Sequence, residues 1–353
     1  MYLVKNELAV DQQIQTELQN KSCTESLRDM IIRVKSEPKR KMIYSGIKEN
    51  SVGFVFGPAK SGKTILCENL GFSIAAGLDS YLGKPIEIEN RKVLFISLEE
   101  FYPDRTERNE KQTNRLVEEM GYEWINNYRV VNENMPRYIS LVEDWEMLHT
   151  IFQEEKPGTV FIDSLSRLYS GSIEDSATAK ELMKKLRELA NSTKTTIVII
   201  HHTPKMHDST PITIASLAGS RMIGQEADFA IGINKTVNNT RYLKDVAFRY
   251  ASDDKETVDV IKLTDDLWFE KIEEVQESKI LACSDGRRND VNRNRVLDFI
   301  ISKSEINNGI VKTGEINEGI DGISKQAIAE ILKSLADDGK INKVFHGEYK
   351  AVL

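Results

Sequence analysis

The middle of the chain alternates short apolar runs with amphipathic stretches. The runs at residues 52–56, 93–98, 159–162 and 196–200 are almost continuously apolar. Strands that are covered on both faces in a parallel sheet have this pattern. Between the last two runs, residues 179–190 carry apolar side chains at the spacing of an amphipathic helix. The order strand, helix, strand predicts an α/β fold with a mostly parallel central sheet.

The pattern changes after Asp228. Four further strands are predicted, joined by short polar turns, and we expect them to extend the sheet at one edge; they cover residues 227–233, 242–250, 257–263 and 268–272. The following stretch, residues 276–292, is largely polar and contains the turn signal Ser284-Asp-Gly. It is therefore predicted to be a linker that ends a main domain of residues 46–275.

A small unit is predicted at residues 293–353. Residues 295–302 and 313–319 are the first two expected helices, and Ser324 is a plausible N-cap for a third helix that ends at Gly339. Two short strands flanking His346-Gly-Glu then predict a hairpin. Three helices followed by a β-ribbon is the order of a winged helix-turn-helix domain.

At the other end, residues 1–45 are predicted to form an N-terminal arm. The arm is polar apart from a short amphipathic helix that ends at Pro38. The segment 37–42 is basic and is predicted to be a tether to the main domain. The apolar positions of this helix are Leu27, Met30, Ile31 and Val34.

Composition narrows the class of protein. The 353 residues are 40% hydrophobic and 29% charged, with a net charge of −7, which is typical of a soluble globular protein. No apolar window is long enough to span a membrane, and no secretory signal is recognisable. The cysteines are few, odd in number and far apart, so a reducing, cytoplasmic location is expected. The acidic balance argues against coating of nucleic acid by bulk positive charge, although a local basic channel is compatible with it. The cysteines, Cys23, Cys67 and Cys283, fit neither a disulfide framework nor a zinc site.

The strongest chemical motif is a phosphate-binding loop. The sequence Gly57-Pro-Ala-Lys-Ser-Gly-Lys-Thr64 follows a predicted strand and precedes a predicted helix. Its glycines let backbone N–H groups converge on phosphate oxygens at a helix N-terminus. Lys63 is expected to reach the terminal phosphates of ATP, and the Thr64 hydroxyl is placed to bind Mg²⁺. The residues expected to bind the nucleotide are Gly57, Pro58, Ala59, Lys60, Ser61, Gly62, Lys63, Thr64 and Ile65.

Acidic residues end two of the predicted strands. Asp163 follows an apolar strand as a Walker B aspartate does, and it is expected to bind Mg²⁺. Glu99 and Glu100 end another strand, and one of them beside the terminal phosphate could deprotonate the attacking water. A solvated turn carboxylate is the alternative interpretation.

A third strand ends in His201 and His202. Two interpretations compete with a role at the nucleotide: a pair of hydrogen-bonded structural histidines, or half of a metal site with His207 as a further ligand. The sequence suggests no other ligand nearby, so a catalytic metal at this pair is the weaker alternative.

Together these motifs resemble the RecA-like P-loop ATPases, and most closely the AAA_25 branch that contains the plasmid replicative helicase RepA. The resemblance spans residues 46–275, and its matching runs are residues 57–64, 80–85, 92–100, 162–165, 201–205, 219–221 and 227–228. It implies that Glu99 is the catalytic base, that Asp163 is the Walker B acid and that His202 senses the γ-phosphate.

The resemblance also implies partners. Such proteins commonly form hexameric rings in which ATP lies between subunits and a neighbour supplies an arginine finger. For that role we favour Arg249, with Arg241 and Lys244 as alternatives. The loop at 206–216 would face the ring channel and single-stranded DNA. Only Lys205, His207 and Arg221 supply cations around that loop, which is a weak footprint for a DNA-tracking motor.

The C-terminal unit departs from plain RepA-like helicases, which need no winged helix. From residue 289 onward it holds nine Lys/Arg and ten Asp/Glu residues, so protein docking competes with duplex DNA binding as its role. The DNA contacts, if it binds DNA, are predicted to be Ser324, Lys325, Gln326, Lys343 and Lys350.

Two functions follow from the sequence. The first is a ring-forming ATPase of the replicative-helicase type, from a plasmid, phage or other mobile element. The second is a nucleotide-gated regulator or adaptor that uses its winged helix without unwinding DNA. A KaiC-like or recombinase-like signalling ATPase ranks below both, because residues 80–85 and 201–205 fit RepA relatives better.

Overall fold

The structure is a computed structural model that describes residues 24–205, 210–236, 239–252, 256–306, 309–345 and 347–352. The chain divides into an N-terminal unit, Met1–Lys41, and a larger unit, Met42–Leu353. In the N-terminal unit the predicted amphipathic helix is present as α2 (Leu27–Ser36), and the Ser26 hydroxyl caps it by accepting a hydrogen bond from the Asp29 amide at 3.1 Å.

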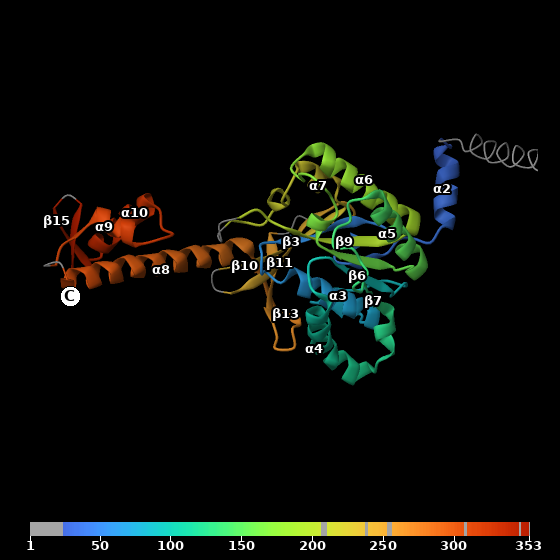
Figure 1. Ribbon diagram of the computed structural model, residues 1–353, viewed down its shortest axis with the longest axis horizontal. Helices are drawn as coiled ribbons and strands as arrows, with labels where there is room; N and C mark the ends of the chain where they lie inside the picture. Colours follow the sequence, from blue (N-terminus) through green and yellow to red (C-terminus); the bar gives the residue numbers. More distant parts are fainter. Residues whose placement is uncertain are drawn as a thin grey trace, which may run out of the picture. The chain divides into compact units, whose positions relative to one another are not determined.

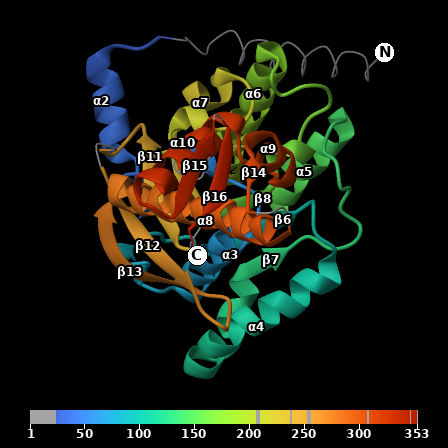
Figure 2. The same ribbon diagram turned by 90° about the vertical axis from the view of Figure 1, so that its left-hand side faces the viewer.

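The larger unit is built on a nine-stranded sheet with the order β13-β12-β11-β10-β3-β9-β8-β6-β7. All neighbours from β10 to β7 pair in parallel, whereas β10, β11, β12 and β13 pair antiparallel in sequence order. Figure 2 shows β11, β12 and β13 together at one edge, where the sequence predicted the extension. The strands are β3 (Val52–Gly57), β6 (Val93–Ser97), β7 (Tyr128–Val130), β8 (Thr159–Asp163), β9 (Thr196–His202), β10 (Phe229–Lys235), β11 (Arg241–Phe248), β12 (Thr257–Leu263) and β13 (Phe269–Gln276).

Helices cover both faces of this sheet (Figure 1), as the continuous apolar runs predicted. One face packs against α3 (Lys63–Ala76) and α4 (Tyr102–Met120), and the other against α5 (Val142–Glu155), α6 (Ser176–Thr193) and α7 (Arg221–Glu226). Successive strand residues alternate between the two cores: Val55 lies in the first, Phe54 and Phe56 in the second, and all are almost fully buried.

Short elements complete the connections of the larger unit. They are β1 (Met42–Tyr44), β2 (Ile47–Lys48), β4 (Ser80–Tyr81), β5 (Lys84–Pro85) and the 3₁₀ helices η1 (Glu123–Asn127), η2 (Leu165–Arg167) and η3 (Ile214–Ser216).

The prediction of a turn within the linker at 276–292 is wrong. The backbone there is part of one continuous helix, α8 (Glu277–Ile306), which passes through the Ser284-Asp-Gly sequence. A single glycine costs a helix interior only about 1 kcal/mol relative to alanine. Apolar residues at both ends of α8 are buried, Leu281 near the start and Val296 and Ile300 further along, and this burial outweighs the local turn preference.

Beyond residue 292 the predicted order of elements is confirmed. The later part of α8 packs with α9 (Thr313–Gly319) and α10 (Lys325–Asp337), and a three-stranded sheet has the order β14 (Val311–Lys312), β16 (Glu348–Ala351), β15 (Ile341–Phe345). Ser324 caps α10 by accepting a hydrogen bond from the Ala327 amide at 3.2 Å. These elements share a separate apolar core around Ile316, Ile328 and Leu332.

Among the described residues, no helix has both the length and the apolar character needed to cross a membrane.

Candidate nucleotide-binding site

The predicted phosphate-binding loop connects the end of β3 to the start of α3. Gly62 adopts a φ of 104°, which favours glycine, and it directly precedes Lys63, the first residue of α3. Gly57 lies so close to β10 that a Cβ atom there would be 2.0 Å from the carbonyl oxygen of Ile233. The two glycines therefore allow the tight course of the backbone around the N-terminus of α3.

Lys63 lies inside the curve of this loop. Its Nζ donates hydrogen bonds to the carbonyl oxygens of Gly57 at 3.0 Å and Pro58 at 2.8 Å. Burial lowers the pKa of Lys63 to about 8, although the nearby carboxylates of Asp163 and Glu99 act in the opposite direction. The ammonium group is thus held at the loop by acceptors that anionic phosphate oxygens could replace.

Thr64 and Asp163 meet at the carboxyl edge of the sheet. The Thr64 hydroxyl donates to Asp163 Oδ2 at 2.6 Å. Burial raises the pKa of Asp163 to about 6, even though this hydrogen bond favours the ionised form. A buried carboxylate with incomplete charge compensation beside a hydroxyl fits Mg²⁺, which prefers oxygen ligands.

The described residues contain no group of three or more His, Cys, Asp or Glu side chains that could hold a metal ion by themselves. A cation at Thr64 and Asp163 would therefore need oxygens from water and phosphate, as Mg²⁺ does in nucleotide sites. His207 lies outside the described residues, as does Cys23. Among the described residues, His201 and His202 therefore have no third metal ligand of these types beside them.

The two adjacent glutamates point to different partners. Glu99 accepts hydrogen bonds from the hydroxyls of Ser164 and, at 3.0 Å, Ser166. Burial alone would raise the pKa of Glu99, but the two hydroxyls, together with the charges of His202 and Arg167, hold the pKa below its ordinary value. Glu100 instead pairs with Arg108.

Arg108 is a cavity residue that the sequence interpretation missed. Its guanidinium donates to Glu100 Oε2 at 2.6 Å and to both oxygens of Glu68, at 3.0 and 2.6 Å. Glu68 is fully buried on α3, so Arg108 ties the start of α4 to the helix that follows the phosphate-binding loop. Arg108 is 8 positions from Glu100 and 40 from Glu68, and neither spacing is a local signal for these contacts.

The histidine pair ends β9 beside the phosphate-binding loop, since Gly57 and His202 are register partners. His202 is half-buried, and burial together with the charge of Lys63 lowers its pKa. His201 is buried, its Nε2 lies 3.0 Å from the Ala218 carbonyl oxygen, and burial lowers its pKa to about 4. His202 therefore faces the site, whereas His201 supports the backbone behind it.

One cavity of about 450 Å³ brings together the predicted site residues Lys63, Thr64, Glu99, Asp163 and His202. Arg241, which the sequence offered as an alternative arginine finger, also lines it and donates from Nε to the Ser61 carbonyl oxygen at 3.1 Å. The lining residues are Lys60, Gly62, Lys63, Thr64, Ile65, Glu99, Glu100, Arg108, Asp163, Ile200, His202, Arg241 and Leu263.

Arg249 and Lys244 lie outside the lining of this cavity. Arg249 pairs with the buried Asp228 at 3.1 Å, and Asp228 Oδ2 accepts from the amide of Val52 at the start of β3. That is the end of β3 opposite to Gly57. Lys244 pairs with Glu277. A finger acts on a neighbouring subunit, so the role of Arg249 stays a prediction.

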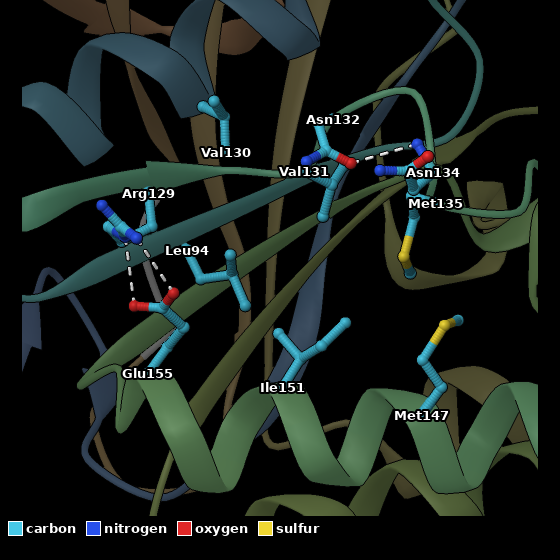
Figure 3. Close-up of a pocket in the computed structure, with 10 residues that line it drawn as sticks. All are labelled: Leu94, Arg129, Val130, Val131, Asn132, Asn134, Met135, Met147, Ile151 and Glu155. Atoms are coloured by element: carbon cyan, nitrogen blue, oxygen red, sulfur yellow. Dashed lines mark hydrogen bonds and ion pairs between the residues drawn. The ribbon is translucent and has the colours of Figure 1, made fainter.

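A second cavity, of about 290 Å³, lies between β7 and α5 (Figure 3). Arg129 and Glu155 pair there through two contacts of 3.1 and 3.2 Å, and the methionines Met135 and Met147 line the opposite part. None of the predicted site residues is in this cavity, so the chemistry is concentrated at the first.

Comparison with known proteins identifies a family for this chain. No curated protein matches the sequence. A family model described as an AAA domain, AAA_25, matches residues 19–208, which is more than half of the chain. The matched range includes the phosphate-binding loop, Glu99, Asp163 and His202. The chain therefore belongs to the AAA_25 family of P-loop ATPases.

Proposed function

We propose that this protein is an ATP-hydrolysing motor of the RecA/RepA type that forms a ring, commonly hexameric in this class, and acts on single-stranded DNA. The observation that carries the proposal is the convergence of Lys63, Thr64, Asp163 and Glu99 on one cavity. Charge-stabilising groups and a base at one point are what hydrolysis of a phosphoanhydride requires.

The roles of the residues follow from their positions. Backbone amides of the loop and Lys63 hold the phosphates of ATP. Mg²⁺ bound near Thr64 and Asp163 would neutralise charge on the phosphate oxygens. Glu99 orients a water molecule and accepts its proton as the water oxygen attacks the γ-phosphorus, and the bond to the β-phosphate oxygen breaks to release ADP.

The adjacent glutamates provide the decisive test. Glu99→Gln is expected to lower kcat by about 10²–10⁴-fold, because the proton acceptor is lost, while the affinity for a non-hydrolysable ATP analogue stays within about threefold. Glu100→Gln removes one ion pair with Arg108 and is the matched control, expected to retain most of kcat. Equal losses in the two variants would contradict the role of Glu99.

The motor function needs separate measurements. We expect single-stranded DNA to stimulate ATP hydrolysis, and light scattering to give a mass several times that of the 40.1 kDa chain. Arg249→Ala is expected to reduce hydrolysis in the assembled ring if Arg249 is the finger. An active ATPase that is monomeric, unaffected by DNA and inactive in strand displacement would refute the motor while leaving the nucleotide site intact.

A second candidate is a nucleotide-gated DNA-binding regulator. It is favoured by the C-terminal arrangement of three helices and a hairpin, in which Lys325 at the start of α10 and Lys343 and Lys350 on the hairpin are exposed. In the full chain, Lys325→Ala with Lys343→Ala should weaken binding to duplex DNA at least tenfold and leave ATP hydrolysis unchanged. Lys180→Ala on α6 is the control for loss of an exposed lysine.

A further inference from the structure

Glu277, the first residue of α8, carries a buried carboxylate that the proposed chemistry does not use. Its Oε1 accepts hydrogen bonds from the Tyr242 hydroxyl and from the Ile212 amide, both at 3.0 Å, and its Oε2 pairs with Lys244. The residue is only 6% exposed. Burial of a carboxylate is tolerated when its oxygens are fully satisfied in this way.

The contact with Ile212 fixes a segment that returns to the nucleotide site. The Ile212 side chain is fully buried over β10 at Gly232, where a Cβ atom would lie 2.8 Å from Ile212 Cδ1. The next residues form a tight turn, in which the Ser216 amide donates to the Thr213 carbonyl oxygen at 2.9 Å. The segment is therefore held by its side chain, by its own turn and by Glu277.

The same segment then contacts both histidines at the end of β9. The Ala218 amide donates to the His202 carbonyl oxygen at 3.1 Å, and the Ala218 carbonyl oxygen lies 3.0 Å from His201 Nε2. Glu277 and His202 are thus connected through residues 212–218, with a hydrogen bond at each end.

We propose that Glu277 is a positioning residue through which α8 sets the position of His202 at the nucleotide cavity. Because α8 also carries Val296 and Ile300 of the C-terminal core, a partner bound there could alter ATP hydrolysis through this connection. The inference rests on the proposed function, since its readout is ATP turnover.

A purely stabilising role predicts a different pattern of mutant behaviour. Tyr242→Phe would remove the hydroxyl that donates to Glu277 and would lower stability, but it would keep the hydrogen bond between Glu277 and Ile212. Glu277→Ala removes that hydrogen bond together with the charge. If Glu277 only stabilises the fold, turnover by the folded protein should be unchanged in both variants.

The experiment uses the full chain and measures kcat, KM for ATP, binding of a fluorescent ATP analogue and thermal stability. Glu277→Ala is expected to lower kcat about tenfold, within the usual range of coupling between sites, with KM and analogue affinity within about twofold. Glu277→Gln keeps an oxygen acceptor for Ile212 and Tyr242 and should restore most of kcat. Tyr242→Phe should lower stability yet retain kcat.

A double mutant tests the route through the histidine. Once His202→Ala has been made, adding Glu277→Ala should cause no further loss of kcat. The proposal is overturned if Glu277→Ala turns over ATP like the wild type, if its effect adds fully to that of His202→Ala, or if Tyr242→Phe loses as much kcat. A wild-type protein without ATPase activity would overturn the proposed function as well, so the two failures are distinguishable.

Discussion

Two pairs of identical neighbouring residues, Glu99 with Glu100 and His201 with His202, have different surroundings within each pair. Glu99 is held ionised by two serine hydroxyls, while the neighbouring Glu100 is turned to Arg108. His202 faces the cavity, while His201 is packed behind it with the Ala218 carbonyl oxygen as its partner. His201 and His202 lie on strand β9, where successive side chains point to opposite faces, so these adjacent histidines acquire different surroundings. Glu99 and Glu100 lie in the bend that follows β6, and each side chain finds its own partners there.

His201 should make the protein sensitive to mild acid. Its pKa falls from 6.5 to about 4 on folding, mainly through burial. The hydrogen bond to the Ala218 carbonyl oxygen and the charge of Glu99 act against this shift, whereas the charges of His202 and Lys63 act with it. At pH values between about 4 and 6.5, His201 is therefore protonated in the unfolded chain but neutral in the folded chain. The stability is fully present above pH 6.5 and is lost as the pH falls toward 4, by about 3 kcal/mol in all.

This expectation can be checked by urea unfolding at pH 7.5 and pH 5. We expect His201→Gln, which can still donate to Ala218, to lose less stability between the two pH values than the wild type, by about 2 kcal/mol. Identical pH dependence in the two proteins would show that His201 does not contribute.

At the scale of elements, buried charges tie the two-stranded sheet β4-β5 to the antiparallel extension of the large sheet. Lys84 of β5 lies 2.8 Å from Asp245 Oδ1 on β11 and 3.3 Å from Asp259 Oδ2 on β12, and Lys271 of β13 approaches Asp259 Oδ1 at 2.6 Å. Both aspartates are nearly buried. The run at 80–85, which resembles the family, thus includes a lysine that anchors three strands rather than one that binds nucleotide.

Lys84→Met should therefore reduce stability without removing the nucleotide site. It leaves two buried carboxylates with less positive charge, and we expect the free energy of unfolding to fall by about 3 kcal/mol. Lys180→Met on the surface of α6 is the control, expected to change it by less than about 0.5 kcal/mol. Denaturant unfolding monitored by tryptophan fluorescence measures both, and equal stability of the two variants would contradict the anchor.

The larger unit as a whole contains three separate apolar cores. Two apolar cores, one on each face of the sheet, support the nucleotide cavity, and a third core unites the end of α8 with α9, α10 and the C-terminal sheet. No member of the third core belongs to the cavity lining. The nucleotide site and the C-terminal cluster are thus built from different residues.

A chain ending at Asn292 should accordingly keep its basal ATPase activity within about twofold, because it retains the cavity, the two sheet cores and Glu277. A chain ending at Gln276 lacks Glu277 and is expected to lose kcat about tenfold, as Glu277→Ala does. Turnover of ATP without DNA, measured on both chains after their folding is checked by circular dichroism, tests this division. Loss of activity already at Asn292 would show that the C-terminal core supports the site.

The sequence by itself determined the features that depend on neighbouring positions. Continuous apolar runs predicted the buried parallel strands, the Gly57–Thr64 spacing predicted the loop between β3 and α3, and Ser324 predicted the start of α10. Each of these rests on local backbone geometry or on burial of one element, which a short window of residues records.

Only the tertiary structure decided which distant groups meet. Ile212 and Glu277 are 65 positions apart, Lys84 and Asp245 are 161, and Arg108 reaches Glu68 across 40. The continuity of α8 through its turn sequence was likewise decided by burial at both ends. Such contacts follow from strand order and helix packing, which bring together side chains whose mutual distance no local pattern encodes.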